Sequence, residues 1–142
     1  MKILIDEFLA QKSFAVVGSF RNESKYGYKI LKDLKNKGYT VYPVNPGVKE
    51  VEGLKCYPSI MEIPEAVDVV DLVTPPLVTE KILTECLQKG ISRVWIQPGA
   101  ESAEAIKYCE KNDIKVVYNA CVMLGGPMDV NSGKHSSELN RL

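Results

Sequence analysis

Apolar residues gather along the chain in short blocks that are separated by longer stretches of mixed character. Blocks that are brief and rich in β-branched residues are typical of strands buried on both faces. They predict strands at 13–18, 39–44, 67–73, 92–97 and 114–118. Elsewhere, apolar positions recur at helical spacing, and this pattern predicts helices at 2–12, 26–37, 77–89 and 103–112.

Strand and helix alternate in this prediction, and that order is typical of right-handed parallel crossovers. We therefore expect an α/β fold: a Rossmann-like, open, doubly wound and mainly parallel sheet of five to six strands with helices on both faces. The connection at 50–57 is a candidate for a short edge strand. The apolar pattern weakens toward the C-terminal end of the chain. We therefore assign 1–124 to one Rossmann-like domain and predict an extended tail or flexible flap at 125–142.

Length and charge narrow the classes of function. A chain of 142 residues suits one domain with its own core, and 18 basic residues balance 18 acidic ones. This balance gives no global attraction to nucleic acid or to an acidic membrane, so neither is an expected partner. No apolar run approaches the roughly 18 residues of a membrane span, and the first residues lack the apolar core of a signal peptide. We therefore expect a cytoplasmic protein.

The cysteines and the histidine do not suggest a metal site. Cys56, Cys86, Cys109 and Cys121 lack CxxC spacing, and His135 is the single histidine, so we expect no zinc. We predict reduced thiols that mostly pack in the interior. Cys121 lies at a predicted strand end, where a lowered pKa would let it react with a ligand thiol. A buried packing role is favoured for it, because no His or Lys neighbours it in sequence.

The most informative stretch runs from residue 14 to residue 27, FAVVGSFRNESKYG. A buried strand ends there at a glycine, a polar and basic loop follows, and a helix begins near Tyr26. This arrangement presents backbone N–H groups and the positive end of the helix dipole to an anion. We therefore predict a phosphate-binding loop, and the alternative for Arg21 and Lys25 is a solvated surface loop.

The strand ends supply further candidates. In a doubly wound sheet, ligands bind outside the carboxyl ends of the strands, near the point where the strand order reverses. Small residues, prolines, amides and hydroxyls gather at these ends, which suits a slender, partly apolar ligand lying along the backbone. The candidate binding residues are Gly18, Ser19, Phe20, Arg21, Lys25, Tyr26, Gly27, Val44, Asn45, Pro46, Thr74, Pro75, Pro76, Gln97, Gly99, Asn119 and Cys121.

Two departures from the dinucleotide fingerprint argue against NAD. The glycines of GxGxxG lie close together, whereas eight residues separate Gly18 from Gly27. NAD-binding domains also carry an acidic residue at the end of the second strand, where this chain has Asn45 and Pro46. An NAD(P)-binding oxidoreductase or redox-sensing module on the same fold is therefore only the alternative function.

Several blocks together carry a family resemblance: FAVVGSFRNESKYGYKIL, GYTVYPVNP, GLKCYPSI, VDVVDLVTPP, VWIQPGAES and NACVML. In collinear order over roughly residues 8–124, they resemble the small single-domain CoA-binding proteins, whose fold is that of the CoA-binding domain of the succinyl-CoA ligase alpha subunit. The resemblance implies that coenzyme A or an acyl-CoA binds at the strand ends. By motif position it implies pyrophosphate contacts at 18–21 and 25–27, adenosine beside 44–46, and a pantetheine arm that runs past 74–76 toward 97–99.

Catalytic groups are not evident in the sequence. No nucleophile paired with a base emerges, and no set of metal ligands does. Asp68 and Asp71 are three apart in a strand, so they point to opposite faces and cannot form a carboxylate pair. The resemblance does not imply ligase activity, because the phosphohistidine and nucleotide-grasp parts of the ligase belong to other domains. We interpret the chain as a module that binds a small-molecule CoA ligand, and we leave open a homodimer or a partner enzyme.

Overall fold

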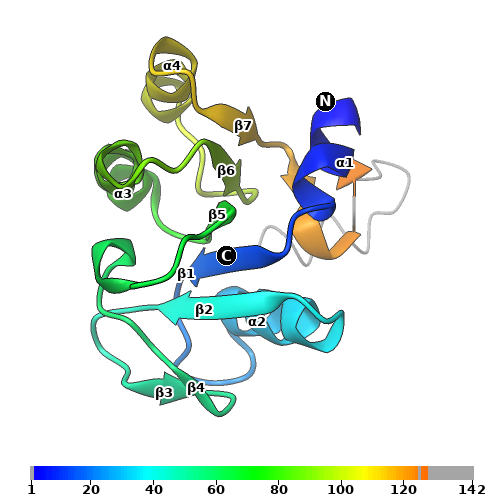
Figure 1. The fold of residues 1–142 in the computed structure, drawn as a ribbon, viewed down its shortest axis with the longest axis vertical. Coiled ribbons are helices and arrows are strands. Elements are labelled where there is room, and N and C mark those ends of the chain that lie inside the picture. The colour runs from blue at the N-terminus through cyan, green and yellow to red at the C-terminus, as the bar shows by residue number, and fades with distance from the viewer. Residues whose placement is uncertain (1, 125, 128–142) are drawn as a thin grey trace.

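The computed structural model describes residues 2–124 and 126–127, and its centre is a five-stranded parallel sheet (Figure 1). Its strands are β1 (Ser13–Val17), β2 (Thr40–Val44), β5 (Val69–Leu72), β6 (Arg93–Ile96) and β7 (Lys115–Val117). They lie in the order β2-β1-β5-β6-β7, and each neighbouring pair is parallel. The predicted doubly wound sheet is confirmed, and its strand order reverses between β1 and β5.

Helices cover both faces of this sheet, as predicted (Figure 1). They are α1 (Lys2–Leu9), α2 (Tyr26–Asn36), α3 (Pro76–Lys89) and α4 (Ala103–Lys111). Helices α1 and α2 lie on one face, and α3 and α4 lie on the other. The ends of these helices fall within three residues of the predicted ones, because the apolar stripe that defines each helix is local in sequence.

Strand β1 shows why the sheet separates two cores. All five of its residues are buried, and successive side chains point to opposite faces. Phe14 and Val16 pack on the side of α1 and α2, whereas Ala15 and Val17 pack on the side of α3 and α4. A central strand that is covered on both faces requires a continuous apolar run, and the sequence has such a run there.

A hairpin occupies the connection where the sequence predicts a single short edge strand. Its antiparallel strands are β3 (Glu50–Val51) and β4 (Leu54–Lys55), and they form a sheet of their own. Tyr57, two residues after β4, pairs with the edge strand β2: its N–H donates to the carbonyl of Pro43 at 2.9 Å. The 3-10 turn η1 (Ile60–Glu62) then begins after Ser59, whose side chain caps it.

The last described residues form a second hairpin that the sequence did not predict. Strand β8 (Ala120–Cys121) pairs with β9 (Gly126–Pro127), and the 3-10 turn η2 (Val122–Leu124) lies between them. The domain boundary at residue 124 stays a prediction. The predicted tail beyond residue 127, with its histidine, lies outside the described residues.

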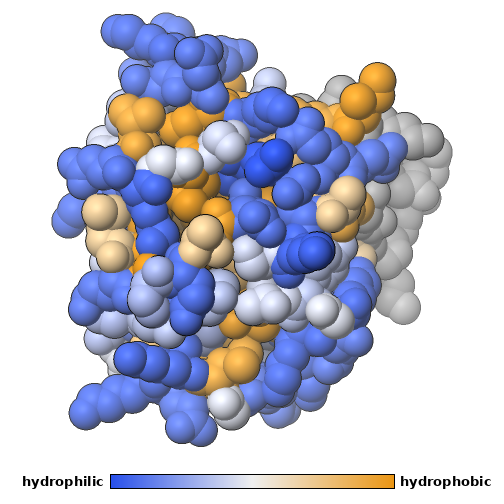
Figure 2. All heavy atoms as spheres, in the orientation of Figure 1, coloured by the Kyte–Doolittle hydropathy of each residue, from blue (hydrophilic) through white to orange (hydrophobic). Residues whose placement is uncertain are grey.

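The surface is mostly hydrophilic on the face that Figure 2 presents, and apolar residues are visible there mainly in furrows. No helix in the described part of the chain combines the length and the apolar character needed to cross a membrane. The polar side chains that the core does bury are Ser13, Asp71, Thr79 and Gln97. Each of them requires a hydrogen-bond partner, and two of these side chains bond to each other near the site described below.

Candidate functional site

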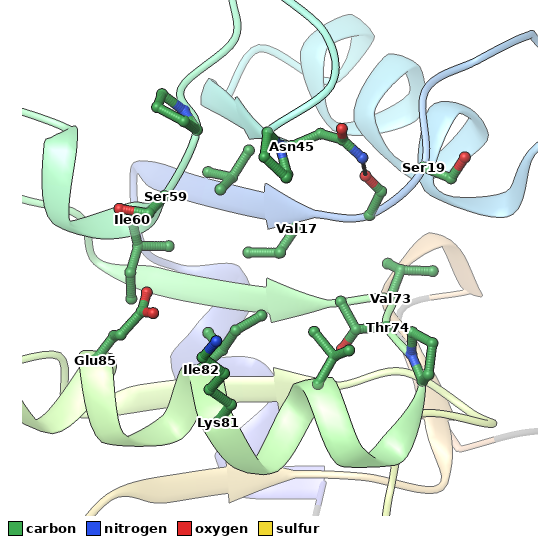
Figure 3. Close-up of a pocket in the computed structure, with 16 residues that line it drawn as sticks. Val17, Ser19, Asn45, Ser59, Ile60, Val73, Thr74, Lys81, Ile82 and Glu85 are labelled. Atoms are coloured by element: carbon green, nitrogen blue, oxygen red, sulfur yellow. Dashed lines mark hydrogen bonds between the residues drawn. The ribbon is translucent and has the colours of Figure 1, made fainter.

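Two adjoining cavities open at the carboxyl ends of the central strands. The first has a volume of about 400 Å³ and lies where the strand order reverses, and we call it the switch-point cavity (Figure 3). This is the place where doubly wound sheets bind their ligands. The predicted residues that line it are Gly18, Ser19, Val44, Asn45, Pro46, Thr74 and Pro75.

The second cavity lies against the first turn of α2, has a volume of about 390 Å³, and is called the loop cavity below. The predicted residues that line it are Ser19, Lys25, Tyr26, Gly27, Thr74, Pro75 and Gly99. Ser19, Thr74 and Pro75 belong to both linings, so the two cavities adjoin. Together they form one elongated site, which we call the carboxyl-edge groove.

Gly18 and Gly27 are far apart in the loop sequence but touch in the fold. A Cβ atom on Gly18 would lie 3.4 Å from the Cα atom of Gly27. A Cβ atom on Gly27 would lie 3.1 Å and 3.2 Å from the backbone oxygen and nitrogen of Ser19. The two glycines therefore let the end of β1 pack directly on the start of α2, which is one role of glycine in the dinucleotide fingerprint. The wide spacing of the two glycines in the sequence, which argued against NAD, gave no indication of this contact.

Helix α2 begins at the loop cavity without a side-chain cap. Lys25 holds the N-cap position in an extended conformation, with φ −71° and ψ 140°, and its side chain makes no capping hydrogen bond. The first N–H groups of any helix have no partner within the helix. This helix end therefore presents backbone donors and a positive dipole to an anion in the groove.

Asn45 braces the ends of β1 and β2 (Figure 3). Its Nδ2 donates to the carbonyl oxygen of Gly18 at 2.6 Å, and its Oδ1 accepts from the N–H of Gly47 at 2.7 Å. Both ends of the amide are thus engaged in the cavity wall. NAD-binding domains place an acidic residue that holds the ribose at this position, so the chain uses the position for architecture instead.

Helix α3 supplies a wall of the switch-point cavity that the sequence analysis missed. The unpredicted lining residues are Val17, Pro58, Ser59, Ile60, Val73, Val78, Lys81, Ile82 and Glu85. Val78, Ile82 and Glu85 follow one another at helical spacing, so they share one face of α3. That spacing, on the helix that directly follows the strand end at Thr74, was the sequence signal that could have revealed this wall. The apolar part of this stripe was used only to predict the helix.

Several predicted binding residues lie outside the linings of these two cavities. They are Phe20, Arg21, Pro76, Gln97, Asn119 and Cys121. Phe20 is 4% exposed and packs in the core beneath α2, so its side chain supports the loop from inside. Arg21 is exposed in the loop between Ser19 and Lys25. Pro76 and Asn119 are also exposed.

A buried polar chain connects β5, β6 and the turn after β8. Gln97 donates through Nε2 to Oδ1 of Asp71 at 2.7 Å, and its Oε1 accepts from the N–H of Val122 at 3.4 Å. Oδ2 of Asp71 is buried and has no hydrogen-bond partner among the described residues. Burial raises the pKa of Asp71 to about 7, although the hydrogen bond from Gln97 opposes the rise. A neutral carboxylic acid is therefore accessible here at ordinary pH.

The cysteines are buried, as predicted, and Cys121 contacts the hydroxyl of Tyr26, which lines the loop cavity. Burial raises the pKa of Cys86 far above its ordinary value, and it raises the pKa of Cys109 to about 12. These two thiols therefore stay protonated at neutral pH. Over residues 2–124 and 126–127, no group of three or more His, Cys, Asp and Glu side chains is arranged to hold a metal ion.

Known proteins share this geometry. The family described as the CoA binding domain matches residues 12–127. The chain belongs to the CoA-binding domain family. The family resemblance drawn from the sequence blocks is thus confirmed.

Relatives of this CoA-binding domain include larger ligases. An ADP-forming acetate–CoA ligase of Methanocaldococcus jannaschii is 37% identical over 106 residues, which cover 75% of this chain and 15% of the ligase. The alpha subunit of the ADP-forming acetate–CoA ligase II of Pyrococcus furiosus is 34% identical over 140 residues, which cover 96% of this chain and 31% of the subunit. The CoA-binding domain thus spans less than a third of either relative.

A solved structure of similar size also matches. It is a conserved hypothetical protein from Pyrococcus furiosus, with 43% sequence identity and a TM-score of 0.78. The match covers 82% of this CoA-binding domain and 100% of that chain. The same architecture therefore occurs in a protein no longer than the domain itself.

Proposed function

We propose that this domain binds coenzyme A or an acyl-CoA along the carboxyl-edge groove, without catalysis of its own. One observation carries the proposal: a largely apolar cavity adjoins an uncapped helix N-terminus at the point where the strand order reverses. CoA consists of a nucleoside, a pyrophosphate and a slender arm, and these parts suit a site that combines an apolar cavity with a helix N-terminus. Membership of the CoA-binding domain family and similarity to CoA ligases support the same ligand.

In this proposal the parts of CoA follow the groove in order. The pyrophosphate lies at the turn from β1 into α2, where backbone N–H groups and Lys25 face it. The adenosine occupies the switch-point cavity, whose volume falls within the roughly 300–1,000 Å³ of small-molecule sites. The pantetheine arm runs through the loop cavity, past Thr74 and Pro75 and toward Gly99.

Calorimetric titration with CoA, dephospho-CoA and NADH tests the proposal. We expect CoA to bind and NADH to bind more weakly, because the chain places Asn45, whose amide is already engaged, where NAD-binding domains hold the ribose. Absence of CoA binding at millimolar ligand, or tighter binding of NADH, would overturn it. Mass spectrometry of the small molecule that co-purifies with the native protein gives an independent reading.

Arg21 and Lys25 are the proposed cations for the phosphates. Both are exposed, and neither forms an ion pair within the described part of the chain. We expect Arg21→Ala and Lys25→Ala each to weaken CoA binding by about 1–3 kcal/mol, since each removes a charge-assisted hydrogen bond. Titration calorimetry measures the change, and Lys107→Ala on the exposed face of α4 is the matched control. Wild-type affinity in both loop variants would mean that the phosphates bind elsewhere.

A further inference from the structure

We infer that Glu85 and Ser59 recognise the adenine base of the ligand and make the groove selective for adenine over a 6-oxopurine. The inference rests on the proposed function, because it concerns the base of the nucleotide that the groove binds. Neither residue lies at the end of a sheet strand, and neither is among the binding residues predicted from the sequence. Both line the switch-point cavity.

The switch-point cavity has polar groups at two separated ends (Figure 3). Ser19 lies at one end, close to the start of α2, where the phosphates are proposed to bind. Glu85 lies at the other end and extends from α3 toward the opposite wall, where the side chain of Ile60 lies between it and Ser59 in this view. Val17 and Ile82 present aliphatic side chains between the two ends. A flat base that reaches in from the phosphate end would contact these aliphatic groups and turn its edge toward Glu85 and Ser59.

Glu85 offers hydrogen-bond acceptors to the cavity. Its side chain is half-buried, and within residues 2–124 and 126–127 its carboxylate takes part in no ion pair. Lys81 lies one helical turn earlier on the same wall, but it forms no ion pair with Glu85. A carboxylate only accepts hydrogen bonds, and partial burial without a donor is unfavourable. The cavity therefore favours a ligand that brings an N–H group to this position.

Ser59 supplies the complementary donor. Its Oγ accepts from the N–H of Met61 at 3.2 Å, which caps η1. This bond uses a lone pair of the hydroxyl oxygen and fixes where the oxygen lies, while the hydroxyl hydrogen remains able to donate. The far end of the cavity thus presents one acceptor, on Glu85, and one donor, on Ser59.

Adenine matches this pair of groups. It carries an exocyclic amino group, a donor, next to ring nitrogens that accept. Glu85 would accept from the amino group, and Ser59 would donate to N7, the ring nitrogen on the same edge of the base. On this edge a 6-oxopurine such as hypoxanthine presents only acceptors, O6 and N7, so O6 would face the carboxylate of Glu85 and leave it without a donor.

The test compares CoA with its deaminated analogue, in which hypoxanthine replaces adenine, by calorimetry on wild-type protein and Glu85→Gln. We expect the wild type to bind CoA about 10- to 100-fold more tightly than the analogue. In Glu85→Gln we expect the two ligands to bind within about threefold of each other, because the new amide can donate to the 6-oxo group. Glu110→Gln, on the exposed end of α4, should keep the wild-type ratio.

The outcomes separate this inference from the function on which it rests. An unchanged preference in Glu85→Gln, or a wild type that does not distinguish the two bases, overturns the inference and leaves CoA binding intact. A wild type that binds neither ligand at millimolar concentration overturns the proposed function and the inference together. Ser59→Ala provides a second variant, in which we expect a smaller loss of preference, with thermal unfolding as the check that the loss of the η1 cap has not unfolded the domain.

Discussion

The two edges of the parallel sheet use their polar side chains differently. At the amino edge these groups are partnered: Asp68 accepts from the N–H groups of Lys12 and Ser13, each at 3.0 Å. Glu7 on α1 pairs there with Arg93 at 2.9 Å and with a lysine of β7 at 3.0 Å. These contacts fasten the helix and the strand starts to one another, and none of these side chains lines the two cavities at the other edge.

At the carboxyl edge, polar groups instead surround open space. The α2 N-terminus has no side-chain cap, and Arg21, Lys25 and Glu85 form no ion pair within the described residues. Asn45, whose amide is engaged at both ends, holds the cavity wall in shape. The difference teaches that stabilising ion pairs and hydrogen bonds gather at the amino edge, whereas the charged groups available to a ligand gather at the carboxyl edge.

Asp71 breaks that division, because it is a titratable group in the interior that belongs to neither edge. Its pKa rises from the ordinary 3.8 to about 7 on burial, so the folded state keeps a proton that the unfolded state releases. The stability that this group contributes is therefore complete below about pH 4 and is lost as the pH rises toward 7. The difference of about three pKa units limits the contribution of Asp71 to the free energy of unfolding to roughly 4 kcal/mol.

We expect Asp71→Asn to remove most of this pH dependence, because an amide keeps the acceptor for Gln97 and cannot ionise. Denaturant unfolding at pH 4, 6 and 8 measures it. Asp6→Asn, at an exposed position of α1, is the control and should follow the wild type. If the free energy of unfolding changed with pH in the same way in the wild type and in Asp71→Asn, the result would contradict the raised pKa of Asp71.

Gly27→Ala should damage the carboxyl edge selectively. The new methyl group would press on backbone atoms of Ser19 at 3.1 Å and 3.2 Å, and backbone cannot move aside as a flexible side chain does. We expect CoA affinity to fall about 100-fold, close to 2.7 kcal/mol, because the phosphate loop moves away from α2. Calorimetry measures the affinity, and chemical unfolding measures the accompanying loss of stability.

Gly38→Ala is the matched control for this change. Gly38 has a φ of +95° with open space around it, so alanine strains the backbone there without touching the groove. We expect a loss of stability of about 1 kcal/mol and no change in CoA affinity. Equal effects of the two alanines on binding would argue that general destabilisation, and not the contact between the glycines, determines affinity.

Asp68→Ala should damage only the amino edge, and by the smallest amount. Burial raises the pKa of Asp68, but hydrogen bonds from the N–H groups of Lys12 and Ser13 outweigh burial and leave the pKa below its ordinary value. The contribution of this carboxylate is therefore present at neutral pH and lost as the pH falls below about 4. We expect a loss of about 1–2 kcal/mol at pH 7 and unchanged CoA affinity.

Denaturant unfolding and calorimetry together check the Asp68 prediction, with Glu65→Ala at an exposed position as the control. A change in CoA affinity without a change in stability would reverse the proposed division between the edges.

The fold was accessible from the sequence because its signals are local. The continuous apolar run from Phe14 to Val17 is what a strand covered on both faces requires, and the stripe on α2 follows the helical period. The hairpins β3–β4 and β8–β9 were not accessible, since strands of two residues carry no periodicity. Their positions depend on pairing partners that only the folded chain brings near.

The site was predictable only where position along a strand determines it. The strand ends follow from the α/β pattern, so Ser19, Asn45 and Thr74 could be named as candidates, and all three line the switch-point cavity. The contact between Gly18 and Gly27 and the wall formed by α3 arise from packing between elements, which sequence spacing does not reveal. Phe20 was named as a candidate with the other residues of the loop at 18–21, and its side chain packs in the core.

Trp95 gives the domain an intrinsic optical reporter. It is the single tryptophan of the chain, it is fully buried, and its Nε1 donates to the carbonyl of Ala120 at 2.9 Å. Its register partner on β5 is Asp71, and its ring meets Phe8 edge to face. Emission from this indole is expected at short wavelength, and it should shift when a negative charge forms on the neighbouring carboxyl group or when the segment at Ala120 moves away. Fluorescence can therefore follow both events in the unlabelled protein.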